Sequence, residues 1–294
     1  FISGFDWPTR QAIFPTLIDK ADMMSAVALN SIIWQSSRMV MPALGGIIIA
    51  VADTWVVFTL CGFGFLTMFS VVATLPIHGK PTPGTGSALQ QIAEGLRFVV
   101  THRLFTIFIS LSYAGMFFGM AHMQLMPAFA NLLESTERGY GLLISATGVG
   151  SVIGTIVVGY YQASPRIGWF ILCTSMLSGL SIFVFAAVTG YFPVGLATYS
   201  IAIIALMLGS MMSSMFMIAS MTILQMNVPD HLRGRVMGFH GITYSLMPLG
   251  GLFAGWIASM SSAPVAIFVS VTLYFIIIGV IAITQKEVRA LAAA

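Results

Sequence analysis

The chain has 294 residues, of which 58% are hydrophobic and only 7% are charged, with a net charge of +3 and a mean hydropathy of +0.97. Soluble domains carry about a quarter of charged residues, so these values exclude a soluble globule, a disordered chain and a nucleic-acid-binding domain. Cys61 and Cys173 lie within apolar runs and form neither a disulfide framework nor a ligand pair with metal spacing. The composition therefore predicts an all-α, polytopic membrane protein.

Stretches long enough for a membrane helix, which needs about 20 mostly apolar residues, follow one another along the chain. Residues 1–18 read as the second half of one span, which ends at a charged turn. Because the chain begins without methionine and inside this span, we expect a fragment of a longer protein. Eight full spans are expected after the partial one: one each in 23–52, 54–79, 104–133 and 139–165, two in 167–229 and two in 236–285.

The basic residues fall mainly on one side of the predicted membrane. Alternate connections carry ten of the 12 Lys and Arg residues, the opposite connections carry Arg138 alone, and Arg38 lies within a span. Lys and Arg are concentrated in cytoplasmic loops, so this side and the C-terminus are expected in the cytoplasm. The ten residues are Arg10, Lys20, Lys80, Arg97, Arg103, Arg166, Arg233, Arg235, Lys286 and Arg289.

The connection of residues 80–103 differs from the others. It starts with a stretch rich in Pro, Gly, Thr and Ser and continues with apolar residues at helical spacing, opposite a polar face that includes Glu94 and Arg97. A flexible linker with an interfacial helix suits a boundary between two bundles, and an ordinary long loop is the alternative. We expect 1–79 to belong to an N-terminal bundle, 80–103 to be a cytoplasmic linker, and 104–294 to form a six-helix C-terminal bundle.

Two parts of the chain resemble each other. Asp22 precedes Met41-Pro-Ala-Leu-Gly-Gly46, and Asp230 precedes Met247-Pro-Leu-Gly-Gly251. Each part runs from a charged turn into a helix that holds a proline and a glycine pair, and six predicted helices separate the two. Parallel six-helix repeats are typical of major facilitator transporters.

Three segments make this resemblance specific. Asp6-Trp-Pro-Thr-Arg10-Gln, Arg38-Met-Val-Met-Pro42-Ala-Leu-Gly-Gly46 and Val228-Pro-Asp-His-Leu-Arg-Gly-Arg235 resemble the drug- and siderophore-export branch of the major facilitator superfamily. The resemblance covers the whole chain and implies a major facilitator helix bundle. Residues 1–79 then belong to the family's helices 4 to 6, and its first three helices are missing.

The resemblance also implies a function. It indicates a secondary active transporter that exports small amphipathic molecules, drugs or siderophores, across a bacterial inner membrane by proton-coupled alternating access, as a monomer and without a cofactor. A lysophospholipid or other lipid transporter of the superfamily and a non-transporting membrane scaffold are the alternatives. The sequence contains no Gly-x4-Gly-Lys-Ser/Thr, His-Glu-x-x-His or Gly-x-Ser-x-Gly motif, so we expect no enzyme and no metal site.

The first two charged residues, Asp6 and Arg10, lie within the partial span. They are four residues apart and therefore share one helix face, where they can pair. Charge inside a membrane is costly, so it needs a reason. The pair is either part of the substrate or proton pathway or a salt bridge that stabilises the bundle.

The fifth helix of the family carries the next candidates. Gln35, Arg38, Pro42 and Gly45 fall on one polar and small face, which must look toward other helices or water. We expect Gln35 and Arg38 in the substrate or proton pathway. The resemblance implies that Pro42, Gly45 and Gly46 affect the alternation between inward- and outward-open states, and close helix packing is the compatible alternative.

The seventh and tenth helices contribute methionines. Tyr113, Met116, Met120 and Gln124 are predicted on one face of the seventh helix, and Met211 belongs to a methionine stripe on the tenth. Methionine is adaptable and suits a cavity that accepts several bulky ligands. Plain lipid-facing or core packing is the alternative for such a stripe.

The eleventh helix repeats the proline and the glycine pair. Tyr244, Pro248 and Gly251 line one side of it, Gly250 completes the pair, and His240 lies close by. His240 and Tyr244 are candidates for the substrate or proton pathway. A histidine that is satisfied within the bundle is the alternative for His240.

The loop before the eleventh helix holds Asp230, Arg233, Gly234 and Arg235. Its basic residues anchor the cytoplasmic side. The resemblance adds a conformational role, in which the arginines tie neighbouring helix ends together in one state.

Overall fold

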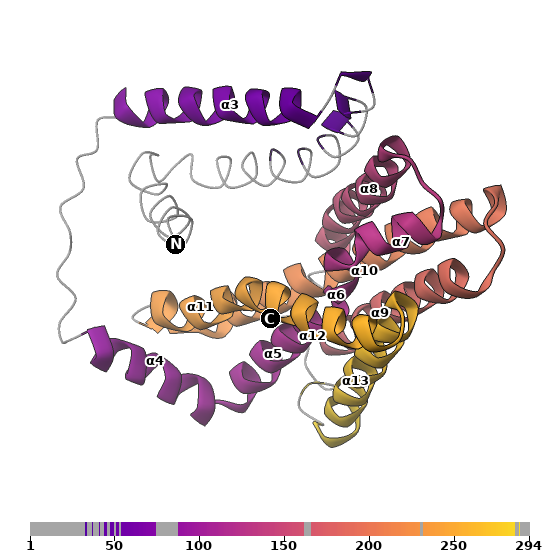
Figure 1. The fold of residues 1–294 in the computed structure, drawn as a ribbon. Helices are drawn as coiled ribbons and strands as arrows, with labels where there is room; N and C mark the ends of the chain where they lie inside the picture. Colours follow the sequence, from indigo (N-terminus) through magenta and orange to yellow (C-terminus); the bar gives the residue numbers. More distant parts are fainter. Residues whose placement is uncertain are drawn as a thin grey trace.

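The computed structural model describes residues 54–74, 88–161, 166–229 and 232–285, with single positions between 33 and 52 and residue 288. Regular structure in these ranges is helical throughout. Most helices pack side by side in a bundle, whereas α3 (Thr54–Thr74) lies apart from it in Figure 1 and has no buried residue. The others are α4 (Ala88–Thr101), α5 (Arg103–Ala114), η2 (Gly115–Gly119), α6 (Ala121–Gln124), α7 (Met126–Leu132), α8 (Glu137–Tyr161), α9 (Ile167–Tyr191), α10 (Leu196–Asn227), α11 (Arg233–Gly241), η4 (Ile242–Ser245), α12 (Leu246–Met260) and α13 (Ala263–Thr284).

Seven of the described helical segments are long and apolar enough to cross a membrane. They coincide with seven of the predicted spans, and the two breaks expected near residues 190–193 and 261–264 occur where α9 gives way to α10 and α12 to α13. The expected span within 23–52 and the partial span of residues 1–18 lie almost entirely outside the described residues. The total of eight full spans therefore stays a prediction.

The predicted seventh helix is not continuous. After α5 the chain forms a π-helical turn, η2, in which Met120 N donates to Gly115 O at 3.1 Å, and the short helices α6 and α7 follow. Met120 and Leu125, on either side of α6, have φ of −98° and −93° with ψ near zero, which interrupts the regular hydrogen bonding. Pro127 has no N–H and lies in the first turn of α7, where none is needed.

The predicted eleventh helix is broken as well. α11 ends at Gly241, a 3₁₀ turn (η4) follows, and α12 resumes at Leu246. Pro248 cannot donate a hydrogen bond to the carbonyl of Tyr244, four residues earlier, which explains the tighter turn at this point. The two broken spans are joined to each other by contacts of α12 with η2 and α6.

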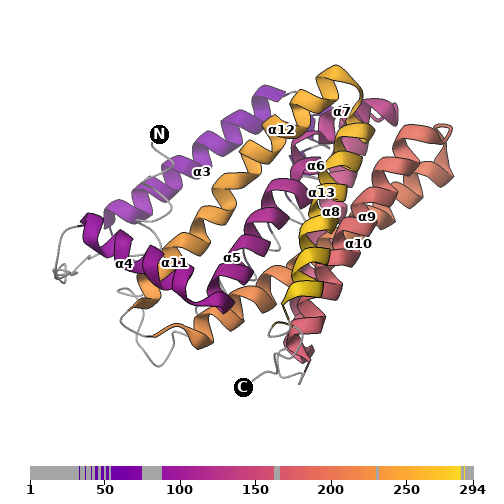
Figure 2. The ribbon, with the colours of Figure 1, turned by 90° about the horizontal axis from the view of Figure 1, so that it is seen from below.

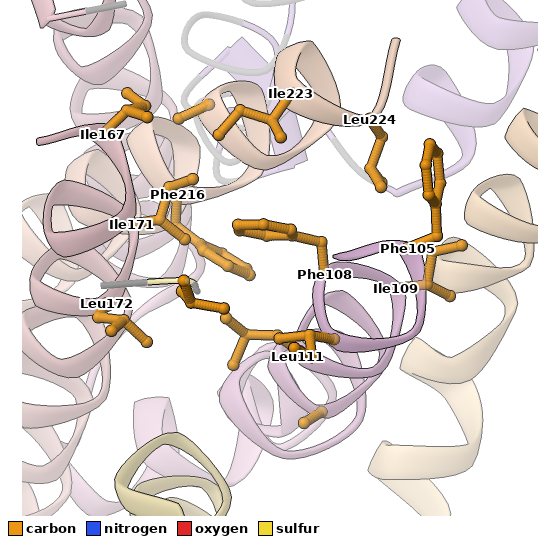
Figure 3. Close-up of a cluster of buried hydrophobic side chains, with 14 of the residues drawn as sticks. Phe105, Phe108, Ile109, Leu111, Ile167, Ile171, Leu172, Phe216, Ile223 and Leu224 are labelled. Carbon is orange, nitrogen blue, oxygen red and sulfur yellow. The ribbon is translucent and has the colours of Figure 1, made fainter. Parts of the chain in front are cut away.

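Two clusters of buried side chains form the core. The first joins α5, α9 and α10, and Figure 3 shows the ring of Phe108 pointing toward Phe216 and Ile171. The second joins α7, α8, α9, α10 and α13 around Phe129 and Phe185, whose ring centroids lie 4.8 Å apart. Apart from Val99 of α4, the buried residues of both clusters belong to the predicted C-terminal bundle, residues 104–294.

The most extensive helix contact among the described elements is between α8 and α10. A Cβ atom on Gly150 would overlap the carbonyl oxygen of Met207 and lie 2.8 Å from its carbonyl carbon, and a Cβ on Gly154 would overlap the carbonyl oxygen of Met211. Glycines four residues apart let two helix backbones approach each other, which is the main source of helix association in a bilayer. The Ser178 hydroxyl on α9 donates to the carbonyl of Gly209 at 3.0 Å and joins the third helix to this pair.

The predicted amphipathic helix of the linker is present as α4. Its buried side, at Gly95 and Val99, packs on α11, where a Cβ on Gly95 would lie 3.0 Å from the Cβ of Arg235. The carboxylate of Glu94, expected on the polar face, forms an ion pair with Arg235. A third, apolar side remains exposed and includes Ile92, Leu96 and Val100.

One end of the bundle gathers the segments that were predicted to be cytoplasmic. Besides the pair of Glu94 with Arg235, Arg103 Nε donates to Gln285 Oε1 at 2.7 Å and ties the start of α5 to the end of α13. Figure 2 shows α4 and α11 at one end of the long helices. Which side of the membrane this end faces stays a prediction.

Candidate functional site

The strongest candidate site is the contact between the two broken spans, which we name the broken-helix seam and define as residues 113–124 and 239–253. Discontinuous helices are costly in a membrane and are typical of transporter binding sites, where they expose backbone groups to a ligand or an ion. π-helical turns are also frequent at functional sites. At the seam, a span that holds a π-helical turn packs against a span that holds a 3₁₀ turn, and the two spans are far apart in the sequence.

The glycine pair of α12 makes the seam tight. A Cβ atom on Gly250 would overlap the carbonyl oxygen of Phe117 and lie 2.7 Å from its carbonyl carbon. A Cβ on the adjacent Gly251 would overlap the side chain of Gln124. The conformational role predicted for the pair stays a prediction, but the close approach gives it a physical basis, since only glycine fits at either position here.

A hydrogen bond closes one end of the seam. The hydroxyl of Tyr113 donates to the carbonyl oxygen of Phe239 at 2.7 Å. This carbonyl belongs to the last turn of α11, directly before the 3₁₀ turn. The contact links the start of one break to the start of the other.

We expect Tyr113→Phe to lower the free energy of unfolding by about 0.6 kcal/mol, the average for hydrogen bonds between membrane helices. The measurement is unfolding by a denaturing detergent, followed by tryptophan fluorescence. Tyr191→Phe is the matched control because Tyr191 is exposed and stacks on Phe268 through its ring alone. Equal effects of the two substitutions would contradict the role of the hydrogen bond.

Three phenylalanines of the seam form an aromatic group. The ring centroids of Phe117 and Phe118 lie 4.7 Å apart, and those of Phe117 and Phe118 lie 5.7 and 5.9 Å from that of Phe253. All three side chains are half-buried. Such a surface can pack against a flat or aromatic ligand. No sequence pattern identified this group, because the apolar chain contains 22 phenylalanines and nothing in the sequence sets these three apart.

The residues predicted on one face of the seventh helix do not share a face. Met116 is buried, Tyr113 and Met120 are half-buried, and Gln124 is exposed. The π-helical turn adds a residue to the helical repeat, so positions on either side of it are rotated relative to each other. The expectation of a single face on one continuous helix was therefore wrong, and a part of these residues in a substrate pathway stays a prediction.

On the tenth helix, Met211 is half-buried, and its carbonyl oxygen is the group that Gly154 approaches. On the eleventh, Tyr244 and Pro248 are exposed on or next to the 3₁₀ turn. The backbone of Met211 thus serves helix packing, whereas Tyr244 and Pro248 lie at the seam.

Two buried histidines belong to the seam. His240, a predicted candidate, is 3% exposed, and its Nε2 has no hydrogen-bond partner among the described residues. His122, which sequence analysis did not single out, is 2% exposed and lies in α6. The available signal for His122 was its place as a lone histidine in an apolar span. His122 belongs to no motif, and its burial depends on the break in the helix.

Gly45, from the motif predicted on the fifth helix, is one of the few described residues of that segment. With Ile49 it lines a cavity of about 580 Å³, whose opposite wall includes Asn131, Glu137 and Tyr140 of α7 and α8. This cavity lies at the end of the bundle away from the pair of Glu94 with Arg235. Its lining joins two described residues of the predicted N-terminal bundle to residues of α7 and α8 in the predicted C-terminal bundle.

The structure describes the remaining predicted residues only in part or not at all. The side chain of Arg233 is not described, although Arg233 and Gly234 both belong to α11. Within the described ranges no group of three His, Cys, Asp or Glu side chains could hold a metal ion. Outside the described residues lie Asp6, Arg10, Gln35, Arg38, Pro42, Gly46 and Asp230.

Comparison with known proteins shows one family over nearly the whole chain. The sequence model of MFS_3, described as transmembrane secretion effector, matches residues 3–294. The chain is 27% identical to the staphyloferrin A transporter of Staphylococcus aureus, over 85% of this chain and 61% of that protein. It is 26% identical to the multidrug efflux pump Tap of Mycolicibacterium fortuitum, over 96% of this chain and 68% of the pump. It is also 26% identical to the enterobactin exporter EntS of Citrobacter koseri, over 77% of this chain and 52% of the exporter.

Proposed function

Because the chain belongs to the transmembrane secretion effector family of the major facilitator superfamily, we propose that the whole protein exports small amphipathic molecules by alternating access. The chain spans 61% of the staphyloferrin A transporter and 52% of the enterobactin exporter, and the proposal concerns the activity of the whole protein. The resemblance to the drug- and siderophore-export branch is confirmed by the family match. The prediction of a multi-pass membrane transporter rather than an enzyme agrees with it.

One observation of the structure carries the proposal: two spans, distant in sequence, are both broken, and they pack against each other through α12, η2 and α6. A scaffold has no need of interrupted helices, which forfeit backbone hydrogen bonds in a solvent that cannot replace them. A transporter uses them to expose polar backbone and to bend. The aromatic group of Phe117, Phe118 and Phe253 beside the breaks supports a bulky, partly aromatic substrate.

The proposal includes the finer expectations drawn from the sequence. The end of the bundle with Glu94 and Arg235 faces the cytoplasm, the side on which the ten basic residues of the alternate connections are expected. The C-terminus lies on the same side. The protein acts as a monomer, with residues 1–79 belonging to the first helix bundle and 104–294 forming the second. Entry of protons down their gradient drives export.

The test is uptake of ethidium into inside-out membrane vesicles that contain the full-length protein. Respiration acidifies the interior, and the proposal expects ethidium to accumulate until a protonophore releases it. Fluorescent lysophosphatidylcholine serves as the second probe. Transport of the lipid but not of ethidium would favour the lipid transporter, transport of neither would favour the scaffold, and ethidium transport that survives the protonophore would exclude proton coupling.

The proposal assigns Arg38, a charge within a predicted span, to the pathway. We expect Arg38→Ala to leave insertion and folding largely intact, because the substitution removes a costly charge rather than a packing contact. Ethidium transport at matched protein levels should fall about tenfold or more, because the pathway loses its guanidinium. Arg38→Lys should recover little, since an ammonium cannot reproduce the planar fork of the guanidinium. The measurement is initial transport rate divided by membrane-inserted protein. A near-normal rate for Arg38→Ala would reduce the residue to a structural one.

A further inference from the structure

His122 occupies an unusual position for an ionisable residue. It belongs to a helical piece of only four residues, α6, that is bracketed by the interrupted backbone at Met120 and Leu125. Its side chain is 2% exposed, within a segment long and apolar enough to cross a membrane. Ionisable side chains inside membranes are rare, and they mark pathways for protons, ions or substrates.

The hydrogen bonding of His122 defines its neutral tautomer. Nδ1 lies 3.0 Å from the carbonyl oxygen of Gly119. A carbonyl oxygen can only accept, so Nδ1 carries the hydrogen and Nε2 holds a lone pair. Nε2 is buried and has no hydrogen-bond partner among the described residues. The imidazole therefore keeps one nitrogen anchored and the other available to receive a proton.

The elements packed on α6 offer no compensating charge. Its neighbours α7, η2, α12 and α13 contain no Asp, Glu, Lys or Arg. The titratable group among them is Tyr274 of α13, and its hydroxyl lies 2.8 Å from that of Ser175. Among the described residues, no element packed on α6 would place an anion beside an imidazolium at position 122, so its protonation favours a rearrangement that brings Nε2 to water or to an acceptor.

The anchored nitrogen connects His122 to the break itself. Gly119 is the last residue of the π-helical turn, and it packs against the ring of Tyr274, from which a Cβ there would lie 3.4 Å away, an ordinary van der Waals contact. The same turn contains Phe117, whose carbonyl is approached by Gly250 of α12. A change in the charge of His122 thus acts on the carbonyl that ends the π-helical turn and, through the turn, on the seam.

The described spans hold few other groups that could carry a proton near neutral pH. Their Asp, Glu, Lys and Arg residues are Arg103, Glu137, Arg138 and Arg235, all at span ends. His240 is the second buried histidine, but it lies on α11, whereas His122 is bonded directly to the π-helical turn. We propose that His122 is the site at which a proton is taken up and released in the transport cycle of this protein. The proposal rests on the proposed export function.

The test uses the full-length protein in liposomes with ethidium as the probe and two measurements. The first is accumulation driven by an acidic interior, and the second is exchange of ethidium at equal pH on both sides, which needs conformational cycling but no net proton movement. His122→Asn keeps an amide that can donate to the Gly119 carbonyl and removes the titratable group. We expect gradient-driven accumulation to fall to the level seen with a protonophore, while exchange continues.

His102→Asn is the matched control. The Nδ1 of His102 lies 2.9 Å from the carbonyl oxygen of Phe98, the same kind of bond, but this histidine is exposed at the start of α5. Both activities should persist in the control. Gradient-driven accumulation that survives His122→Asn would overturn the proposal.

Two further outcomes remain decisive. If His122→Asn loses both activities at normal membrane abundance, His122→Gln is measured as well, and loss of both again would assign His122 a structural role and overturn the proposal. Recovery of exchange alone in His122→Gln would support it. Failure of the wild-type protein to transport ethidium at all would instead contradict the proposed function, and wild-type accumulation without a gradient would contradict proton coupling as such.

Discussion

Replacing Gly250 with alanine is expected to lower transport by the full-length protein roughly ten- to hundredfold. The new Cβ would overlap the carbonyl oxygen of Phe117, which belongs to a backbone and cannot rotate away as a side chain could. Overpacking of this kind costs about 1–3 kcal/mol, and 1.4 kcal/mol corresponds to a factor of ten. Because the overlap occurs where the two broken spans touch, the cost falls on the conformation with a closed seam. The measurement is the initial rate of ethidium transport per inserted protein.

Gly255→Ala is the control for this prediction. Gly255 lies on the same helix, α12, and a Cβ there would meet no atom within 4 Å. Both substitutions change helix propensity by the same amount, so a difference between them reports the contact with Phe117. Equal transport by the two variants would show that the seam opens without cost.

The second large effect is expected at the contact of α8 with α10. We expect Gly150→Ala to lower the free energy of unfolding by about 3 kcal/mol, because its Cβ would overlap the carbonyl oxygen of Met207. Gly154→Ala should have a similar effect through the carbonyl oxygen of Met211. The measurement is unfolding by a denaturing detergent, together with the amount of monodisperse protein recovered from membranes.

Gly159→Ala separates this effect from helix propensity. Gly159 lies on α8, about 1.4 turns beyond Gly154, and a Cβ there would meet no atom within 4 Å. Alanine is the better helix former, so this variant should be as stable as the wild type or slightly more so. Destabilisation of Gly159→Ala equal to that of Gly150→Ala would contradict the packing argument.

The fold class was predictable from sequence because a bilayer constrains its proteins strongly. The thickness of the hydrocarbon core sets the length of each span, and its low polarity keeps charges out of the spans. The charge-free stretches and the prolines at positions 193 and 264 therefore marked the helix limits, and α9, α10 and α13 begin and end close to them. The all-α, polytopic class and the family are confirmed. Hydropathy alone did not reveal the π-helical turn after Ala114, since a π turn and an α turn use the same apolar residues.

The candidate site was predictable in part, because polar residues and glycine pairs stand out within apolar spans. Tyr113, Pro248, Gly250 and Gly251 were recognised by their polarity or their glycine pairing, and the structure brings them to one seam. His122 was missed because its significance lies in its burial beside an interrupted helix. Burial depends on which helices meet, and a single sequence holds no direct record of that.

The length of α10 has a mechanical consequence. Its 32 residues extend about 48 Å at 1.5 Å per residue, against a hydrocarbon thickness of about 30 Å. A charge-free helix of this length tilts, and a tilted helix sweeps a wide arc at its ends for a small rotation at its middle. The glycine contacts with α8 and the hydroxyl contact with α9 hold both neighbours against α10, so we expect these three helices to move as one unit when α10 rotates.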